Sequence, residues 1–303
     1  MMKNKTDDRR RMTNDRSLPS IVHRLPSVST SLRAATHTLT DAGVDSPRLT
    51  AEALLAHTLA ITRTQALSRP ERQLSPAELA QLQNLLSRAA QSEPLAYLTG
   101  HREFYGYNFL VDPRVLIPRP ETELLIDLAL NLQSPISNLS ILDVGTGSGC
   151  LAITLALKLP AAQITAVDIS PDALDLARLN AARLHVSDRI DFTQSDLLSA
   201  FILPPSSFIL LLANLPYVAS RDLAHLPHEP TLALDGGPDG LALFRRFFTQ
   251  APRLMPQSGR LLLEINDQLG QPALTLARAA FPSATIKLHQ DLAYLDRILD
   301  ISL

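Results

Sequence analysis

The second half of the chain alternates short apolar runs with longer segments of helical periodicity. Ser140–Val144, Gln163–Val167 and Phe208–Ala213 are apolar runs of strand length, and the last is apolar throughout, as expected for a central parallel strand. The other predicted elements are helices at Cys150–Leu159, Pro171–Leu184, Leu241–Leu254 and Gln271–Ala280, and strands at Ile190–Phe192, Arg260–Ile265 and near Thr285 and Leu295. This alternation predicts an α/β fold with a doubly wound sheet.

The first third of the chain has a different pattern. From about 27 to 99, leucines recur at helical spacings, and Ser75-Pro76-Ala77-Glu78 predicts a helix start in which Ser75 caps and Glu78 reaches back. Residues 100–118 alternate around Gly106 and predict a β-hairpin linker. The predicted organisation is a disordered tail at 1–26, a small helical domain at 27–99, the hairpin at 100–118 and the α/β domain at 119–303.

Composition narrows the functional classes. Hydrophobic residues make up 46% of the 303 residues and charged residues 19%, which is enough apolar material for a folded core. The formal net charge of -2 argues against a protein that wraps nucleic acid, although the basic tail leaves an arm on ribosomal RNA as an alternative. Cys150 is a single cysteine, which excludes an intramolecular disulfide, and we expect it to pack behind the neighbouring glycines.

The chain also lacks the features of a secreted or membrane protein. Its N-terminus is polar, and no apolar run reaches the roughly 18 residues that a membrane span needs. The sequence therefore predicts a soluble, cytoplasmic protein.

A glycine loop follows the first strand of the α/β region. Gly145, Gly147 and Gly149 lead from that strand into a helix, and Asp168 stands at the end of the next strand, where a carboxylate can accept both hydroxyls of a ribose. A dinucleotide fingerprint would require glycine where Cys150 stands, and no lysine follows as in a phosphate-binding P-loop. The pattern favours a nucleoside ligand over a purely structural turn.

This arrangement resembles the class I S-adenosylmethionine methyltransferases, which have a seven-stranded Rossmann-like domain. The resemblance implies S-adenosylmethionine as the cofactor and places Asp196 near its adenine, with a helix or turn cap as the alternative for Asp196. The cofactor-binding residues that it implies are Gly145, Thr146, Gly147, Ser148, Gly149, Asp168, Asp196, Leu197 and Asn214.

Asn214-Leu215-Pro216-Tyr217 directly follows the fourth strand, at the sheet edge that borders the ligand crevice. It could be an ordinary turn, but it resembles the Asn-Pro-Pro-Tyr motif of methyltransferases that act on planar amide or amino nitrogens. The Asn214 side-chain oxygen and the Leu215 main-chain oxygen could each accept one N–H of the substrate, and Tyr217 could pack on the amide plane. We predict these four residues to be catalytic and substrate-binding, although Leu215 lacks the fixed φ of the family's proline.

Two further segments indicate which family of such methyltransferases the chain resembles. Phe104–Glu123 and Glu229–Leu241 resemble signature segments of the peptide-chain release factor glutamine methyltransferases, the HemK/PrmC family, and the resemblance covers about residues 30–300. It implies that the substrate is the glutamine of the Gly-Gly-Gln tripeptide in class I release factors, and that the helical domain docks this protein. We expect a monomer. Asn266 stands where this family would have glycine.

Alternatives remain open at this stage. Asn-Leu-Pro-Tyr also resembles the motif of ribosomal RNA adenine dimethylases, so an adenine in RNA or DNA is one alternative, and a non-catalytic nucleoside-binding module is another. A sister family methylates a ribosomal-protein glutamine, but its segment reads Pro-Arg-Ser-Pro rather than Pro-Arg-Pro-Glu-Thr-Glu. His225 and His228 have the spacing of a metal pair, yet Pro227 and the lack of a third ligand favour loop histidines and no metal.

Overall fold

The computed structural model describes residues 25–132, 139–201 and 208–303, so most of the predicted N-terminal tail lies outside the described residues. The chain divides into two compact units with the boundary between Leu86 and Ser87. No helix in the described ranges combines the length and apolarity that a membrane crossing requires.

The first unit is helical. Its elements are α1 (Val28–Asp41), α2 (Pro47–Thr58), α3 (Arg63–Leu67) and most of α4 (Pro76–Ala89), which crosses the unit boundary. Leu39, Leu54, Leu55 and Leu82 are buried, as their helical spacing predicts. The predicted start of α4 is confirmed, because the Glu78 N–H donates to Ser75 Oγ at 3.2 Å and the Ser75 N–H donates to Glu78 Oε2 at 2.7 Å.

The predicted hairpin is present at the start of the second unit. After α5 (Leu95–Thr99), strand β1 (His101–Phe104) pairs antiparallel with β2 (Tyr107–Leu110). Tyr105 and Gly106 connect the strands with φ values of 52° and 78°, the left-handed pair that a two-residue hairpin turn requires. The Tyr97 hydroxyl donates to the Val115 carbonyl at 2.7 Å and so ties α5 to the segment that follows the hairpin.

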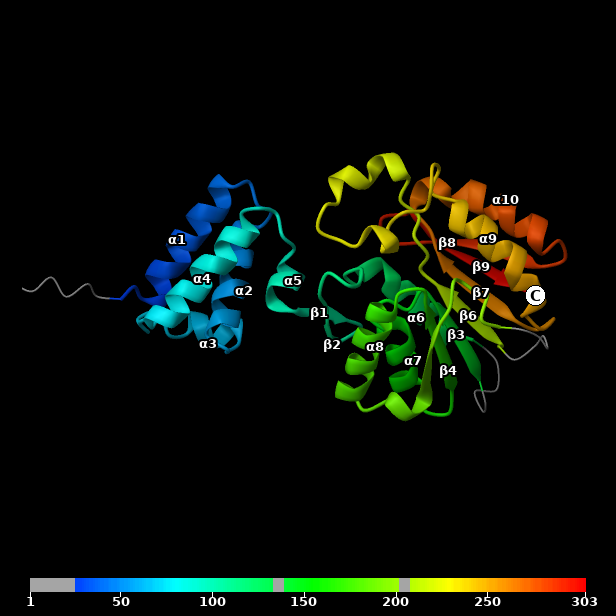
Figure 1. The fold of residues 1–303 in the computed structure, drawn as a ribbon, viewed down its shortest axis with the longest axis horizontal. Helices are drawn as coiled ribbons and strands as arrows, with labels where there is room; N and C mark the ends of the chain where they lie inside the picture. Colours follow the sequence, from blue (N-terminus) through cyan, green and yellow to red (C-terminus); the bar gives the residue numbers. More distant parts are fainter. Residues whose placement is uncertain (1–24, 133–138, 202–207) are drawn as a thin grey trace, which may run out of the picture. The chain divides into compact units, whose positions relative to one another are not determined.

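A mixed seven-stranded sheet forms the body of the second unit, in the order β5-β4-β3-β6-β7-β9-β8 (Figure 1). The strands β3 to β7 are parallel to one another, whereas β9 is antiparallel to both β7 and β8. Their bounds are β3 (Ser140–Val144), β4 (Gln163–Asp168), β5 (Ile190–Gln194), β6 (Leu210–Ala213), β7 (Arg260–Glu264), β8 (Thr285–Gln290) and β9 (Asp296–Ser302). The predicted doubly wound sheet is confirmed.

Helices cover both faces of this sheet. They are α6 (Glu123–Leu130), α7 (Cys150–Lys158) and α8 (Pro171–Arg183) on one face, and α9 (Ala242–Gln250) and α10 (Gly270–Ala280) on the other (Figure 1). Because successive strand residues point to opposite faces, Leu142 and Val144 join the core under α9 and α10, whereas Ile141 joins the core under α6 and α7. Apolar residues on both strand faces explain the unbroken apolar runs in the sequence.

Some element ends differ from the prediction. The helix predicted at Leu241–Leu254 ends at Gln250 and continues as a 3₁₀ turn at Ala251–Arg253, because Pro252 has no N–H to donate to the preceding turn. Strand β5 extends two residues beyond Phe192, where it pairs with the end of β4.

Candidate active site

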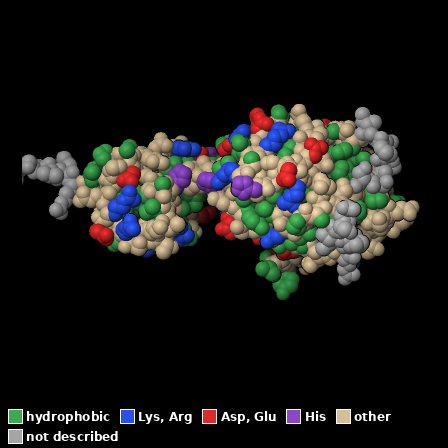
Figure 2. Space-filling view, turned by 90° about the horizontal axis from the view of Figure 1, so that it is seen from below, with side chains coloured by type: hydrophobic (Ala, Val, Ile, Leu, Met, Phe, Trp, Pro, Cys, Tyr) green, Lys and Arg blue, Asp and Glu red, His purple; other side chains and the backbone are tan. Residues whose placement is uncertain are grey.

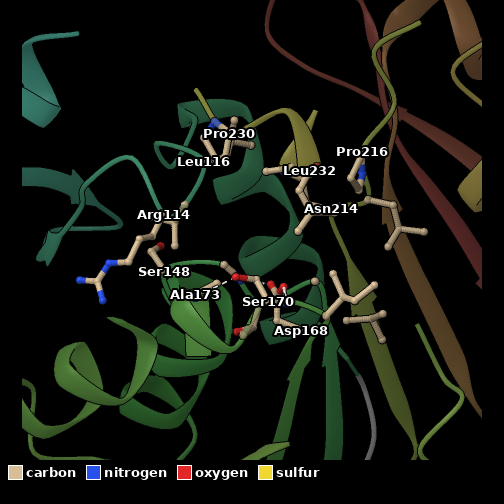
Figure 3. Close-up of a pocket in the computed structure, with 18 of the residues that line it drawn as sticks. Arg114, Leu116, Ser148, Asp168, Ser170, Ala173, Asn214, Pro216, Pro230 and Leu232 are labelled. Atoms are coloured by element: carbon tan, nitrogen blue, oxygen red, sulfur yellow. Dashed lines mark hydrogen bonds between the residues drawn. The ribbon is translucent and has the colours of Figure 1, made fainter. Parts of the chain in front are cut away.

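A cavity of about 700 Å³ opens at the carboxyl ends of the parallel strands. This volume lies within the range of small-molecule and cofactor sites. The glycine loop after β3, Asp168 at the end of β4, Asp196 after β5 and Asn214 after β6 all line it. Figure 3 shows Asp168 and Asn214 approaching this space from the ends of different strands. The structure therefore brings together residues that the sequence connected only by motif.

The glycine loop depends on its backbone conformation. Gly145, Gly147 and Gly149 have φ values of 75°, 54° and 81°, which side chains rarely adopt. Ser148 lies in this loop, and its Oγ is buried without a hydrogen-bond partner and lines the cavity. An unpartnered buried hydroxyl at a cavity wall fits a polar ligand.

Gly149 has a different role from its neighbours. A Cβ on Gly149 would lie 2.8 Å from Ile153 Cδ1 and 3.2 Å from Ala177 Cβ, so this glycine allows α7 and α8 to pack closely. Among the described residues that line the cavity, Gly149 is absent. Gly145, Thr146, Gly147 and Ser148 do line the cavity, and the cofactor contact of Gly149 stays a prediction.

Asp143 stabilises the glycine loop through hydrogen bonds. Its Oδ2 accepts the Thr146 hydroxyl at 2.7 Å and the Ala152 N–H at 3.2 Å. Burial raises the pKa of Asp143 to about 7, against the effect of these two hydrogen bonds. Its ionised form is therefore disfavoured in the folded protein, while the unfolded carboxyl ionises near its ordinary pKa.

The pKa shift of Asp143 predicts a pH-dependent stability. A folded-state pKa above the unfolded value stabilises the fold at low pH, and this contribution is lost as pH rises through the folded pKa. We expect the free energy of unfolding of Asp143→Asn, relative to the natural protein, to increase by about 2 to 4 kcal/mol between about pH 5 and about pH 8, at about 1.4 kcal/mol per pKa unit. Urea denaturation at the two pH values measures this difference.

Asp235→Asn supplies the control for that experiment. The Ser220 hydroxyl holds the pKa of Asp235 below its usual value, so this carboxylate stays ionised across the same window. The stability difference for Asp235→Asn should therefore stay constant. An equally constant difference for Asp143→Asn would contradict the assigned burial effect.

Asp168 joins the second strand to the glycine loop. Its Oδ2 accepts the Gly147 N–H and its Oδ1 accepts the Ser170 N–H, both at 2.9 Å. Burial raises the pKa of Asp168, while these backbone donors favour its ionised form. Each oxygen retains acceptor capacity, so both can still bind hydroxyls of a ligand in the cavity.

The next acidic position has a partner that the sequence did not reveal. Asp196 lines the cavity and forms an ion pair of 2.6 Å with Arg246 of α9, which also lines it. Leu197 follows with φ 52°, and its carbonyl accepts the Ser195 hydroxyl at 2.8 Å. The predicted cavity position of Asp196 and Leu197 agrees with this arrangement, and no side-chain cap by Asp196 is needed to explain it.

The position of Cys150 agrees only in part with the prediction. It packs against the core beneath α7, as a small hydrophobe would, but it is half-buried and also lines the cavity. Burial raises the pKa of its thiol to about 12, so the thiol stays protonated near neutral pH.

Asn214 and Leu215 line the cavity beside Gly145 of the glycine loop. Asn214 is half-buried and its Nδ2 donates to Thr122 Oγ1 at 3.2 Å. The Leu215 side chain is buried in the core, and its Cδ2 would lie 3.9 Å from a Cβ on Gly145. The leucine that replaces the family's proline thus fills space against the glycine loop, which is a packing reason for this residue.

The Tyr217 hydroxyl contacts a buried carboxyl outside the lining of the cavity. This hydroxyl donates to Glu264 Oε1 at 3.1 Å, and Tyr217 is not among the described residues that line the cavity, although Pro216 is. Burial raises the pKa of Tyr217 above its usual value. The predicted packing of the Tyr217 ring on a substrate amide is therefore not supported, and its contact is with a buried carboxyl.

Sequence reasoning missed that carboxyl. Glu264 ends β7, directly beside the end of β6, and is 2% exposed. Its Oε2 accepts the Thr122 hydroxyl at 2.5 Å. Burial raises the pKa of Glu264 to about 7. An acid directly after the apolar run Leu261–Leu263 was the available signal, because burial of a carboxyl requires partners.

The cavity rim is held by a second unrecognised contact. The Arg119 guanidinium donates to Glu229, and the other Glu229 oxygen accepts the Ile117 N–H at 3.2 Å. This joins the segment before α6 to the segment that carries Pro230 and Leu232, both at the cavity (Figure 3). The two signature segments of the sequence therefore meet at one rim.

Asn266 and the two histidines lie outside the cavity lining among the described residues. Asn266 Oδ1 accepts the Gln268 N–H at 2.9 Å and so caps a 3₁₀ turn, which accounts for asparagine at this position. His228 Nε2 lies 3.0 Å from the Gln91 carbonyl oxygen. Within the described ranges, no three His, Cys, Asp or Glu side chains gather as a metal site would require.

Surface charge gives no sign of a nucleic-acid track on the face drawn in Figure 2. Lys and Arg side chains there are interspersed with Asp and Glu rather than joined in a stripe. At the cavity, Arg114, Arg119 and Arg246 are each paired with a carboxylate, from Asp112, Glu229 and Asp196. The cationic side chains that line the cavity are thus largely neutralised.

Comparison with known proteins gives consistent matches. The PrmC N-terminal domain model matches residues 30–100, and a methyltransferase domain model matches residues 141–234. A release factor glutamine methyltransferase from Moorella thermoacetica is 41% identical over 273 residues, covering 88% of this chain and 95% of the relative. Another from Vibrio cholerae is 38% identical over 276 residues, covering 90% of this chain and 95% of the relative.

Solved structures support the fold. The catalytic domain of hMettl16 in complex with the MAT2A 3'UTR hairpin 1 superposes with a TM-score of 0.53 at 15% identity, covering 78% of this chain and 84% of that chain. This likeness confirms the class I methyltransferase fold.

Proposed function

Because the chain belongs to the S-adenosylmethionine-dependent release factor glutamine methyltransferases, we propose that it methylates the side-chain amide nitrogen of the glutamine in the Gly-Gly-Gln motif of class I release factors. The observation that carries this proposal is the position of Asn214. Its side chain lines the cavity, and its NH₂ group already donates a hydrogen bond to Thr122.

The cavity residues fit the cofactor. S-adenosylmethionine supplies an electrophilic methyl group when it is bound. We assign the binding of the ribose hydroxyls to Asp168, whose two oxygens keep free acceptor capacity. The glycine loop would contact the cofactor through Gly145, Thr146, Gly147 and Ser148. Asp196 and Leu197 are assigned to the adenine side. The unpartnered Ser148 hydroxyl at the cavity supports the assignment of the loop.

The substrate amide would be held by two acceptors. An amide nitrogen is a poor nucleophile because its lone pair is delocalised into the carbonyl. Asn214 Oδ1 and the Leu215 carbonyl would each accept one of its N–H groups and thereby fix the nitrogen in the cavity. They also stabilise the positive charge that develops on this nitrogen during transfer. Pro216 would shape the wall beside these acceptors.

The remaining parts of the proposal concern the partner. The helical unit would dock the release factor, and the chain would act as a monomer. The match of residues 30–100 to the PrmC N-terminal domain supports the docking role. The net charge of -2 favours a protein substrate over RNA or DNA.

Transfer of labelled methyl groups to a purified class I release factor tests this function. We expect label on the natural factor and none on a factor whose Gly-Gly-Gln glutamine is replaced by alanine. Equal label on both factors would contradict the proposed residue. If neither were labelled while ribosomal proteins or ribosomal RNA accepted the methyl group, the proposed substrate would be wrong.

A further inference from the structure

Three side chains connect the predicted substrate acceptor to a buried carboxyl. Asn214 Nδ2 donates to Thr122 Oγ1 at 3.2 Å, and the Thr122 hydroxyl donates to Glu264 Oε2 at 2.5 Å. We propose that Thr122 and Glu264 are positioning residues that fix the Asn214 amide with its oxygen toward the substrate. This inference rests on the proposed function and extends it to residues outside the Asn-Leu-Pro-Tyr motif.

When Glu264 is ionised, the donors and acceptors permit one arrangement. A hydroxyl has one hydrogen, and Thr122 uses it on the Glu264 carboxylate, so the Thr122 oxygen is left as an acceptor. The side chain of Asn214 can satisfy that acceptor with its NH₂ group but not with its oxygen. Its oxygen must therefore point away from Thr122, which leaves Oδ1 free for an N–H of the substrate amide.

A flipped Asn214 would be unproductive. It would present its NH₂ group to the NH₂ group of the substrate, so that two donors would face each other. With no intrinsic preference between its two ends, an amide needs an external contact to select one orientation. Thr122, which is 2% exposed and lines the cavity, supplies that contact.

Glu264 is the acceptor for the Thr122 hydroxyl. The Tyr217 hydroxyl donates to its other oxygen at 3.1 Å, so each oxygen of this buried carboxyl has a donor. Burial raises the pKa of Glu264 to about 7, with Glu121 acting in the same direction, while the Thr122 and Tyr217 hydroxyls and Arg297 lower it. This contact also gives Tyr217 a place in the motif that requires no contact with the substrate.

Isosteric substitution of Thr122 tests the inference. Thr122→Val keeps the shape of the side chain but leaves the Asn214 NH₂ group without its partner, which favours rotation of that group toward the cavity. Since an unsatisfied buried donor is costly, we expect kcat for release factor methylation to fall by about 10- to 100-fold. Cofactor affinity and the KM for the release factor should change by less than about threefold. Thr122→Ser, which keeps the hydroxyl, should restore most of kcat.

Two further variants separate positioning from structural damage. Thr154→Val removes another fully buried threonine hydroxyl, in α7 and without a hydrogen-bond partner, and should leave kcat unchanged. In an Asn214→Ala background, Thr122→Val should cause no additional loss, because Thr122 acts through Asn214.

The outcomes are distinct. Full activity of Thr122→Val, equal loss in Thr122→Val and Thr122→Ser, or additive loss with Asn214→Ala would each overturn the positioning role while leaving the proposed function intact. Absence of transfer by the natural protein in the same assay would overturn the proposed function and the positioning role together.

Discussion

Asn214→Ala should reduce methyl transfer to the release factor by at least about 100-fold while leaving cofactor binding nearly unchanged. The substitution removes one of the two acceptors proposed for the substrate amide, and the Leu215 carbonyl cannot replace it. The residues assigned to the cofactor come mainly from the loops after β3, β4 and β5, and the Asn214 side chain holds none of them in place. Turnover with labelled cofactor and calorimetric titration of the cofactor measure the two effects.

Asn266→Ala is the matched control for that experiment. Asn266 follows the neighbouring strand β7, but its side chain caps a 3₁₀ turn and does not line the cavity. Its loss should lower stability modestly, by about 1 kcal/mol, and leave turnover within about twofold. Retained turnover in Asn214→Ala, or a parallel loss of cofactor binding, would contradict the acceptor role.

Asp168→Ala should weaken cofactor binding more than it lowers turnover, in contrast to Asn214→Ala. The variant loses the acceptors proposed for the ribose hydroxyls and also releases the Gly147 N–H, so the glycine loop loses one of its supports. Hydrogen bonds to a charged group contribute about 1.5 to 3 kcal/mol each, so we expect the dissociation constant of the cofactor to rise by at least about 100-fold. Calorimetry measures this directly, without turnover.

The dissociation constant of the cofactor for Asp168→Asn should lie between those of the natural protein and Asp168→Ala. Asparagine keeps one acceptor oxygen but loses the charge. The turnover of Asp168→Ala at saturating cofactor should recover much of its value, since the substrate wall at Asn214 is unchanged. Cofactor binding of Asp168→Ala within about threefold of the natural protein would exclude the ribose assignment.

Much of the fold follows from local sequence pattern. Apolar runs such as Phe208–Ala213 indicated strands because both strand faces are covered. The glycines after β3 indicated a loop, and the structure gives all three of them positive φ values. The ends of elements were less certain, since they depend on single residues such as Pro252.

The site was predictable only where chemistry lies within one motif. The cavity positions of Asn214 and Asp168 were predictable because Asp168 ends a strand, and Asn214 directly follows one, at the ligand-binding edge of the sheet. The contact of Thr122 with Glu264 joins residues far apart in the chain, and the role of Gly149 depends on the position of Ala177 in another helix. Such pairings arise from tertiary packing, which a single sequence does not encode as a local pattern.

The same limit explains why the sequence did not predict the contact of Tyr217 with Glu264. The motif places this residue next to the acceptors, but sequence adjacency does not fix where a side chain points. The buried Glu264 attracts its hydroxyl away from the cavity, because a buried carboxyl requires donors.

The most direct test of the central claim is to locate the added methyl group. A class I release factor incubated with this enzyme and S-adenosylmethionine can be digested and its Gly-Gly-Gln peptide sequenced by fragment-ion mass spectrometry. The account predicts one added methyl group on the side-chain nitrogen of that glutamine, and none when Asn214→Ala replaces the natural enzyme. A methyl group on any other residue of the factor, or on that glutamine with Asn214→Ala at the natural rate, would contradict it.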